Sequence, residues 1–386
     1  MGKGYVFLSN STKPTNEEQM SRNPIKLTNV SKPCLEVALN MGYDVFFGVN
    51  RFNPEDLYCE LPIKLYDSHT YRNIFSFKDN KIAYKNLMHI LKNNDIDVIH
   101  CNTPVGGLIG RLCGKKRHTR KIIYTAHGFH FYKGNSKIKN FIFKTAEKIM
   151  AKWTDAIITM NKEDYENAKK FKLRKNGHVY FVHGVGIDLS KFSTIVYDDS
   201  LREMLGFKND DILLISAGDL VPRKNYSVAI KAVAKLNNNK VHYLICGIGP
   251  EKDHLIQLAK NLNVEKQIHF LGYRNDILKL MKISNIFIFT TLQEGLPRSL
   301  MEAMASGLPC VVSKIRGNVD LIENGVNGFL CNPNNPIEFS NAISILIENH
   351  QLMLQMKEEN LNSIKNFSVE IVKKEIENIY KEVLSN

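Results

Sequence analysis

The sequence predicts an α/β protein built from two doubly wound parallel sheets, and three observations lead to this expectation. The chain has 386 residues, too many for one ordinary core, so two domains of under about 200 residues each are expected. Short apolar runs alternate with longer helical patterns, which is typical of strand-helix-strand units in parallel sheets. Two such series are separated by the irregular segment HGVGIDLSKFSTIVYDDS, residues 183–200.

The first series predicts the strands of an N-terminal domain over residues 1–195. These strands are expected near Tyr5–Leu8, Tyr43–Gly48, Asp97–His100, Lys121–Thr125, Ala156–Met160 and Val179–Val182. The apolar, β-branched character of these runs favours buried parallel strands.

The second series predicts a C-terminal domain over residues 196–366. Its strands are expected near Ile212–Ser216, His242–Cys246, Ile268–Leu271, Ile286–Thr290, Cys310–Ser313 and Gly328–Leu330. The closing segment, 367–386, carries apolar residues at close to helical spacing from Val369 to Val383, so we expect a final amphipathic helix there.

Composition excludes several classes of protein. Hydrophobic residues make up 44% of the chain and charged residues 24%, which is ordinary for a globular protein. The seven cysteines include no Cys-x-x-Cys pair, which argues against a disulfide framework and a zinc ribbon. No apolar run reaches the roughly 18 residues of a membrane span, and the N-terminal run is too short for a signal peptide. We therefore expect a cytoplasmic protein.

The positive charge is confined to one half of the chain. Residues 1–195 carry a net charge of +14, whereas residues 196–386 carry −1. Within 111–152 there are twelve basic residues and one acid, Glu147. In Lys137–Trp153, apolar residues recur at helical spacing among lysines, which predicts contact with an anionic membrane surface. An apolar stripe that joins the domain core is the alternative reading.

Four loops of the second half leave the carboxyl ends of the predicted strands, where parallel sheets bind ligands. They carry glycines such as Gly218 and Gly247, and the cations Arg223, Lys224 and Arg274. Glycines allow close backbone approach and cations supply charge, so the four loops together predict a site for a nucleotide diphosphate.

Two glutamates stand out in the stretch TLQEGLPRSLMEAMASG, residues 291–307. Pro297 suits the start of a helix and Ser306-Gly307 its end, which predicts a helix over Arg298–Ala305. Glu294 then lies in the preceding loop and Glu302 inside the helix. Both carboxylates are expected to face ligand hydroxyls, because the sequence shows no structural ion pair for either of them. N–H groups from Gly295 onward are expected to face a phosphate.

No metal site is expected. Asp95 and Asp97 resemble a metal-binding carboxylate pair, but they precede the strand DVIH and therefore lie at the end of the sheet opposite to its ligand sites.

At this point a family resemblance becomes clear. EGLPRSLME resembles the E-x7-E motif of retaining glycosyltransferases of family 4, which have the GT-B fold. VHGVGIDLSKF, LICGIGPEKDHL, HFLGYRNDI and TAHGFHFYKG resemble other segments of that family, the last one in members that build capsular or exopolysaccharide repeat units. The resemblance extends from about Asp97 to the C-terminus.

The resemblance implies two Rossmann-like domains facing across a cleft, an acceptor-binding N-terminal domain and a nucleotide-sugar-binding C-terminal domain, with the last helix crossing back. The implied catalytic residues are Glu294, Lys224, Arg223 and His127, and the implied donor-binding residues are Glu302, Gly218, Tyr273, Arg274, Gly295, Arg298, Ser299 and Gly247. Glu294 would contact the donor sugar, Glu302 the ribose, and Lys224 the diphosphate. Tyr273 and Arg274 would lie at the uracil, and His127 would reach the sugar from the first domain.

Two positions depart from the family pattern. Asp219 stands where many members have an arginine that binds phosphate, so Arg223 or Arg298 is expected to supply that charge. Asp219 itself is expected to point away from the ligand, toward a backbone N–H of its own turn. After the first strand, SNSTKPTNEE replaces a glycine-rich loop.

The resemblance therefore implies a metal-independent and cofactor-independent retaining transfer of a hexose or N-acetylhexosamine from a UDP-sugar. The acceptor is expected to be a polyprenyl-diphosphate-linked saccharide of cell-surface polysaccharide synthesis. The enzyme is expected to lie peripherally at the inner face of the cell membrane. A UDP-sugar 2-epimerase of the same architecture is one alternative, and a basic nucleic-acid-binding protein is another, although the basic stretch has no recognised nucleic-acid-binding motif.

Overall fold

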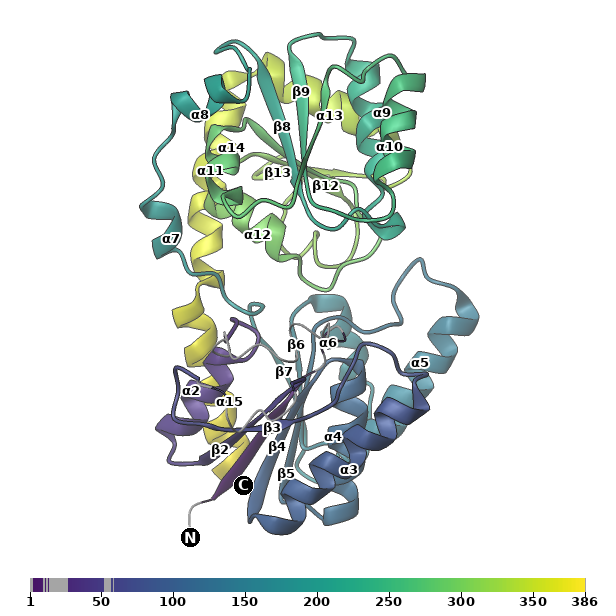
Figure 1. Cartoon of the computed structure of the whole chain (residues 1–386), viewed down its shortest axis with the longest axis vertical. Coiled ribbons are helices and arrows are strands. Elements are labelled where there is room, and N and C mark those ends of the chain that lie inside the picture. The colour runs from purple at the N-terminus through teal and green to yellow at the C-terminus, as the bar shows by residue number, and fades with distance from the viewer. Residues whose placement is uncertain are drawn as a thin grey trace. The chain divides into compact units, whose positions relative to one another are not determined.

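The chain folds into two compact units, which are described separately (Figure 1). The computed structural model describes residues 3–9, 11, 13, 27–51, 57 and 59–385. Unit 1 comprises Met1–Gly186 with Val369–Asn386, and unit 2 comprises Ile187–Ser368. The change between the units therefore comes at the start of the segment expected as a linker, and the rest of that segment contains the short helix α7, Ser190–Ser193.

Unit 1 contains a seven-stranded parallel sheet in the order β3-β2-β1-β4-β5-β6-β7. Its strands are β1 Gly4–Leu8, β2 Asp44–Val49, β3 Lys64–Asp67, β4 Ile96–Asn102, β5 Lys121–Ala126, β6 Ala156–Thr159 and β7 His178–Phe181. Strand β3 was not predicted from the sequence, because KLYD is a short edge strand with a charged residue at each end. Most of the SNSTKPTNEE loop after β1 lies outside the described residues.

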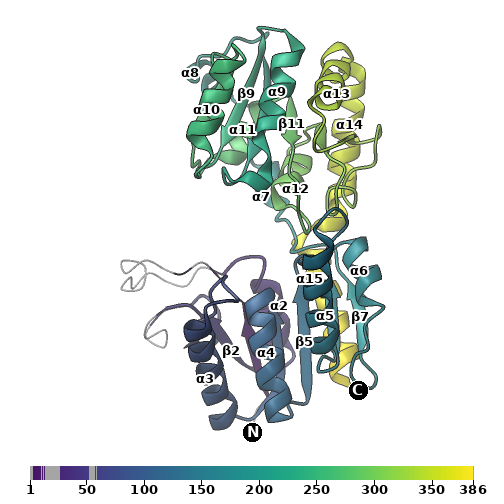
Figure 2. The same ribbon diagram turned by 90° about the vertical axis from the view of Figure 1, so that its right-hand side faces the viewer.

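Helices cover both faces of this sheet, as Figure 2 shows from the side. They are α2 Lys32–Asn40, α3 Phe77–Asn93, α4 Pro104–Arg117, α5 Lys137–Ala151, α6 Lys162–Ala168 and α15 Val369–Ser385. One core joins α3 and α4 to the sheet through side chains such as Leu87, Ile109 and Ile99. The closing helix α15 lies against α2, so the C-terminal segment belongs to unit 1.

A buried hydrogen-bond network fixes α15 to the sheet. Tyr5 of β1 and Tyr380 of α15 have their hydroxyl oxygens 2.6 Å apart, and His100 Nδ1 of β4 lies 2.5 Å from Tyr380 Oη. His100 Nε2 lies 2.7 Å from Thr125 Oγ1. Burial lowers the pKa of His100 to about 3, so the imidazole is neutral and pairs with hydroxyl groups rather than a carboxylate.

Unit 2 contains a six-stranded parallel sheet in the order β10-β9-β8-β11-β12-β13. Its strands are β8 Ile212–Ala217, β9 Val241–Cys246, β10 Ile268–Gly272, β11 Ile286–Phe289, β12 Cys310–Ser313 and β13 Gly328–Cys331. All twelve predicted strands of the two units are present, with ends shifted by at most two residues, and the α/β prediction is confirmed.

Helices also cover both faces of the second sheet. They are α8 Asp199–Met204, α9 Tyr226–Leu236, α10 Lys252–Asn261, α11 Ile277–Ile283, α12 Arg298–Ala305, α13 Pro336–Glu348 and α14 His350–Ser363, with 3₁₀ turns η2 Pro222–Lys224 and η3 Ile364–Phe367. Alternate residues of β8 enter different cores: Leu214 packs with α9 and α13, and Leu213 packs with α11 and α12. The central strands are thus buried on both faces, which leaves the loops at their carboxyl ends to carry function.

Candidate functional site

The candidate site of unit 2 lies where the strand order reverses, between β8 and β11. Such reversal points are where open parallel sheets bind ligands, because the loops leave toward opposite faces. Here the two loops are hydrogen bonded to each other: Leu292 N donates to Arg223 O at 2.8 Å, and Thr290 Oγ1 donates to Asn225 O at 2.9 Å. These two loops, whose residues lie some 70 positions apart in the sequence, therefore form one rigid rim of the candidate site.

The side chains of Lys224, Arg223 and Thr291 converge on one oxygen of Glu294. Lys224 Nζ lies 2.8 Å from Glu294 Oε1, Arg223 Nη1 lies 3.3 Å from it, and Thr291 Oγ1 donates to it at 2.9 Å. The side chains of Lys224 and Glu294 are only 11% and 12% exposed. Lys224 also lies over the Phe289 ring, 4.6 Å from its centroid. Two cations share one carboxylate, which leaves positive charge for an anionic ligand.

Both glutamates are in ion pairs, and the interpretation that the sequence shows none is wrong for Glu302. Glu302 Oε1 lies 2.8 Å from Arg298 Nε, one helical turn away on α12. Burial raises the pKa of Glu302, while the charge of Arg298 acts in the opposite direction. The sequence could not show the pairing of Glu294, because its partners follow a different strand.

The glycines of this rim are needed for close backbone packing. A Cβ atom on Gly247 would lie 2.0 Å from Gly218 O, and one on Gly249 would lie 2.4 Å from Leu220 O. Gly218 N donates to Cys246 O, and the Tyr226 hydroxyl donates to Gly218 O at 2.8 Å. The loops after β8 and β9 therefore lie against each other, which only residues without side chains permit.

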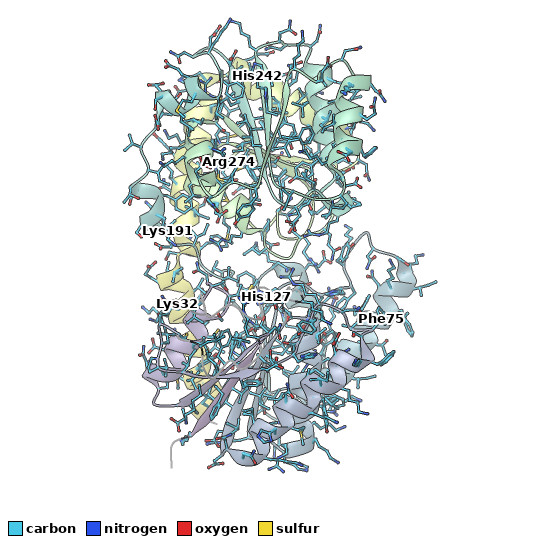
Figure 3. The ribbon with its side chains drawn as sticks, viewed as in Figure 1. Lys32, Phe75, His127, Lys191, His242 and Arg274 are labelled. Atoms are coloured by element: carbon cyan, nitrogen blue, oxygen red, sulfur yellow. The ribbon has the colours of Figure 1, made fainter. Side chains whose placement is uncertain are left out.

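Tyr273 and Arg274 follow β10 but lie in different settings. Tyr273 is 74% exposed. Arg274, labelled in Figure 3, donates to both carboxylate oxygens of Asp276, from Nε at 2.8 Å and from Nη2 at 2.6 Å. The motif GYRND predicted a role for Arg274 but none for Asp276, which lies two residues later in the same motif.

The start of α12 offers backbone donors to this rim. Pro297 is the N-cap, and no side chain of the described residues caps the helix, so the first N–H groups, those of Arg298 and Ser299, have no capping acceptor. Gly295 lies in the loop before it. The nearly buried Arg316, for which the sequence predicted no role, donates from Nε to Glu294 O at 3.0 Å and holds that loop in place.

Asp219 does not make the hydrogen bond that was expected of it. Its side chain is exposed, and no hydrogen bond joins its carboxylate to any described residue. The expected contact with a backbone N–H of its own turn is therefore absent from this part of the chain. Arg223 and Lys224 are the cations that η2 brings to Glu294, while Arg298 is engaged with Glu302 on α12.

In unit 1, His127 lies at the carboxyl end of the sheet (Figure 3). It follows β5 and lines a small pocket together with Asn102, the last residue of β4, and Thr125. His127 Nε2 and both amide atoms of Asn102 are shielded from solvent and have no hydrogen-bond partner among the described residues. Burial lowers the pKa of His127 to about 4, so the ring is neutral at pH 7.

Unpartnered buried polar atoms are rare because each one costs free energy, so His127 and Asn102 are poised to bind polar groups of a ligand. The sequence did not lead us to predict Asn102 as a site residue, although it lies at the carboxyl end of a parallel strand, where such sheets bind ligands. Among the described residues, no group of three His, Cys, Asp or Glu side chains could hold a metal ion. No helix in the described part of the chain is both long and apolar enough to span a bilayer.

Two family models match the chain. The model described as "Glycosyl transferase 4-like" matches residues 32–161, in unit 1, and the model "Glycosyl transferases group 1" matches residues 198–362, in unit 2.

Two curated relatives match most of the chain. The chain is 31% identical over 308 residues to the "Putative glycosyltransferase EpsD" of Bacillus subtilis, covering 78% of this chain and 80% of that one. It is 30% identical over 323 residues to the "UDP-Gal:alpha-D-GlcNAc-diphosphoundecaprenol alpha-1,3-galactosyltransferase" of Escherichia coli, covering 82% of each chain.

Solved structures agree on the fold. The Anabaena protein HepE, in complex with UDP, superposes with a TM-score of 0.76 at 19% identity, covering 99% of this chain and 100% of that one. Sucrose-phosphate synthase from Thermosynechococcus elongatus superposes with a TM-score of 0.80 at 16% identity, with the same coverage. The chain is therefore a glycosyltransferase with the GT-B fold and belongs to the group 1, family 4-like glycosyltransferases.

Proposed function

We propose that this enzyme transfers a hexose or N-acetylhexosamine from a UDP-sugar to a polyprenyl-diphosphate-linked saccharide, with retention of the anomeric configuration, during cell-surface polysaccharide synthesis. The observation that carries the proposal is the convergence of Lys224 and Arg223 on one oxygen of Glu294 at the β8/β11 reversal point. The name of the E. coli relative, which specifies UDP-Gal as donor and a diphosphoundecaprenol-linked GlcNAc as acceptor, supports both substrate classes.

Unit 2 would bind the donor. A diphosphate has the charge and size to interact with Lys224 and Arg223 and with the uncapped N–H groups of α12. Glu294 would then reach the sugar and Glu302 the ribose hydroxyls. Tyr273 is exposed enough to stack on the uracil, whereas Arg274 would keep its bond to Asp276 and contact the base with its remaining N–H groups.

The reaction would need no metal and no protein nucleophile. The bond between the anomeric carbon and the β-phosphate oxygen breaks, and its electron pair leaves with UDP. The acceptor hydroxyl oxygen bonds to the same face of the anomeric carbon, and its proton passes to the departing phosphate oxygen. Lys224 and Arg223 stabilise the charge that develops on the diphosphate, which is where preorganised cations contribute most to rate.

Unit 1 would bind the acceptor at the membrane. Helix α5 leaves Ile138 and Phe141 73% and 72% exposed, with Ile142 and Ile149 exposed as well. The alternative reading, in which this stripe joins the core of unit 1, is therefore wrong for these four residues. An exposed apolar stripe flanked by lysines suits the surface of an anionic bilayer.

His127 and Asn102 would bind sugar hydroxyls from unit 1. A neutral imidazole both donates and accepts hydrogen bonds, and an amide side chain does the same, so the pair matches the mixed character of hydroxyl groups.

A donor panel tests the proposal. Purified enzyme is incubated with each UDP-sugar, with and without a polyprenyl-diphosphate-linked saccharide extract, and UDP release is measured in the presence of EDTA. We expect release that depends on acceptor for one UDP-sugar and that survives EDTA. Interconversion of UDP-sugars without an acceptor would instead identify a 2-epimerase, and loss of activity in EDTA would refute metal independence.

A further inference from the structure

Unit 1 contains a second pocket, on the face of its sheet that α4 and α5 cover. Its walls include Leu108 of α4, Tyr124 of β5, and Phe143, Ala146 and Met150 of α5, and the space between them, including the part open to solvent, amounts to ≈ 550 Å³. Most of this lining is apolar, and no buried polar side-chain atom of its described residues lacks a hydrogen-bond partner. The pocket around His127 also has a largely apolar lining, but it contains the unpartnered polar atoms of His127 and Asn102. The two pockets therefore suit different parts of a ligand.

The one charged side chain in the pocket lining is already satisfied. Glu147 binds Arg111 through both oxygens, from Nη1 at 2.7 Å and from Nη2 at 3.2 Å. Arg111 is fully buried, and its guanidinium lies 3.8 Å from the centroid of the Tyr124 ring. A charge that is buried, paired and hydrogen bonded does not call for an ionic ligand. The free space above it is thus suited to a hydrocarbon group.

The pocket opens between exposed apolar side chains on two elements. On α5, Ala146 lines the pocket and is itself exposed, in line with Ile138, Ile142 and Ile149 on the same helical face. On the other rim, Ile74 lines the pocket, and Phe75 and Phe77 beyond it are 74% and 83% exposed. Figure 3 shows Phe75 at the outer end of α3, beside α5.

On the α5 side of this mouth the charge is basic. Glu147 is the single acid of residues 111–152, and it is paired with Arg111. No other carboxylate of this segment can therefore neutralise its remaining basic residues. Lys137 and Lys139 are exposed at the start of α5, next to Ile138. An apolar pocket with an apolar mouth and surrounding lysines matches an amphiphile with an anionic head group and a long hydrocarbon chain.

The two pockets lie at the same end of the sheet but on opposite faces. Tyr124 lines the apolar pocket and its neighbour Thr125 lines the pocket of His127, as expected for consecutive residues of one strand. At the end of β4, Asn102 lines the pocket of His127, and Pro104 lines the apolar pocket. A chain held in the apolar pocket would thus place its attached head group at the sheet edge that carries Asn102 and His127.

We propose that the pocket between α4 and α5 binds the first isoprene units of the polyprenyl chain of the acceptor, drawn from the membrane on which α5 rests. This inference depends on the proposed function, because it assumes a lipid-linked acceptor. It assigns to Leu108, Phe143 and Met150 a role in acceptor specificity, and it accounts for an apolar cavity whose mouth is open to solvent.

Photolabelling tests the site in the unaltered enzyme. The probe is a farnesyl diphosphate that carries a diazirine on its chain, added to nanodiscs of anionic phospholipid. We expect labelling of Leu108, Phe143 or Met150, with competition by unlabelled polyprenyl phosphate and none by added phospholipid. Labels restricted to Ile138, Phe141 and Ile142, or equal competition by phospholipid, would overturn the proposal in favour of surface adsorption.

A matched pair of variants tests the consequence for catalysis. Leu108→Trp fills the pocket, whereas Leu112→Trp places the same side chain one turn later on α4, at an exposed position outside the pocket. We expect Leu108→Trp to raise KM at least tenfold for the long-chain acceptor, and to leave KM for the same saccharide on a short water-soluble aglycone unchanged. Equal effects on both acceptors, or an equal effect of Leu112→Trp, would contradict the pocket.

The two hypotheses fail in distinguishable ways. If the wild-type enzyme transfers sugar to the short-chain acceptor and its pocket is not labelled, the pocket assignment is wrong and the proposed function stands. If no lipid-linked saccharide accepts sugar from any UDP-sugar, the proposed function is wrong, and the inference falls with it.

Discussion

Lys224 and Glu294 form a largely buried ion pair, with Nζ 2.8 Å from Oε1, that joins the loops after β8 and β11. The same oxygen accepts a bond from Thr291 and lies 3.3 Å from Arg223 Nη1. In the proposed complex Glu294 contacts the donor sugar while the cations contact the diphosphate. The pair therefore sets the orientation of two cations before the donor arrives, which reduces the reorganisation that binding would otherwise require.

The glutamates give the first prediction. Glu294→Gln keeps the shape of the side chain but removes the charge that positions Lys224, so we expect turnover to fall by ~10²-fold or more. Glu302→Gln should act mainly on the ribose, raising KM for the donor more than it lowers kcat. Steady-state kinetics on both variants check this, with melting temperature as the control for folding. Wild-type kcat in a folded Glu294→Gln variant would contradict the assignment.

The second prediction concerns the cations Arg223 and Lys224. We expect Arg223→Ala to weaken UDP binding nearly as much as Lys224→Ala, because both side chains meet at Glu294. Asp219→Asn serves as the matched loop control and should change affinity little, since the carboxylate is exposed and has no hydrogen bond to a described residue. Isothermal titration with UDP measures the affinity of these three variants and of Arg298→Ala. Unchanged affinity in Arg223→Ala together with loss in Arg298→Ala would show that Arg298 is the second phosphate ligand.

Membrane binding gives the third. Binding to anionic vesicles should weaken with salt, with Ile142→Ser, and with Lys139→Glu and Lys148→Glu, because these side chains are exposed on α5. Lys144→Glu should have a smaller effect, since Lys144 is half-buried, donates to Asn167 at 3.0 Å and lies over the Phe131 ring. Vesicle co-sedimentation checks this. Binding that is unaffected by salt and by all four substitutions would show that the membrane contact lies elsewhere.

Histidine burial gives the fourth. Burial lowers the pKa of His127 to about 4, below the unfolded value of about 6.5, so the unfolded chain binds the extra proton between these pH values. Stability of unit 1 should therefore fall as pH drops from about 6.5 to 4, by up to ~1.4 kcal/mol per pH unit for this group.

His127→Gln should remove this part of the pH dependence while keeping that of the other groups. Urea unfolding at several pH values, followed by fluorescence of Trp153, provides the measurement. This is the chain's single tryptophan, and it lies in unit 1 just after α5, so its signal reports on that unit. Parallel pH profiles for the variant and the wild type would show that His127 does not titrate as described.

Local signals in the sequence predicted much of the fold. The helix Arg298–Ala305 has the predicted bounds, because Pro297 and Ser306-Gly307 mark its ends locally. The strands of both sheets were recognisable because parallel strands buried on two faces are continuous apolar runs. Strand β3 lacks such a run and was therefore missed.

Contacts between distant segments could not be predicted in this way. The pairing of Glu294 with Arg223 and Lys224 depends on the adjacency of β8 and β11, which a periodicity does not reveal. The sequence pattern of the apolar stripe on α5 is the same whether the stripe packs in a core or faces solvent. Only the packing of unit 1 shows that Ile138 and Ile142 are exposed. The roles of the site residues in catalysis stay predictions.

The stereochemistry of the transferred sugar tests the central claim most directly. The enzyme is supplied with an α-linked UDP-sugar and a polyprenyl-diphosphate-linked saccharide, and the anomeric proton coupling of the new glycosidic bond is measured by NMR. We predict an α-linked product, formed only with acceptor present. A β-linked product, or sugar interconversion on UDP without any transfer, would contradict the account.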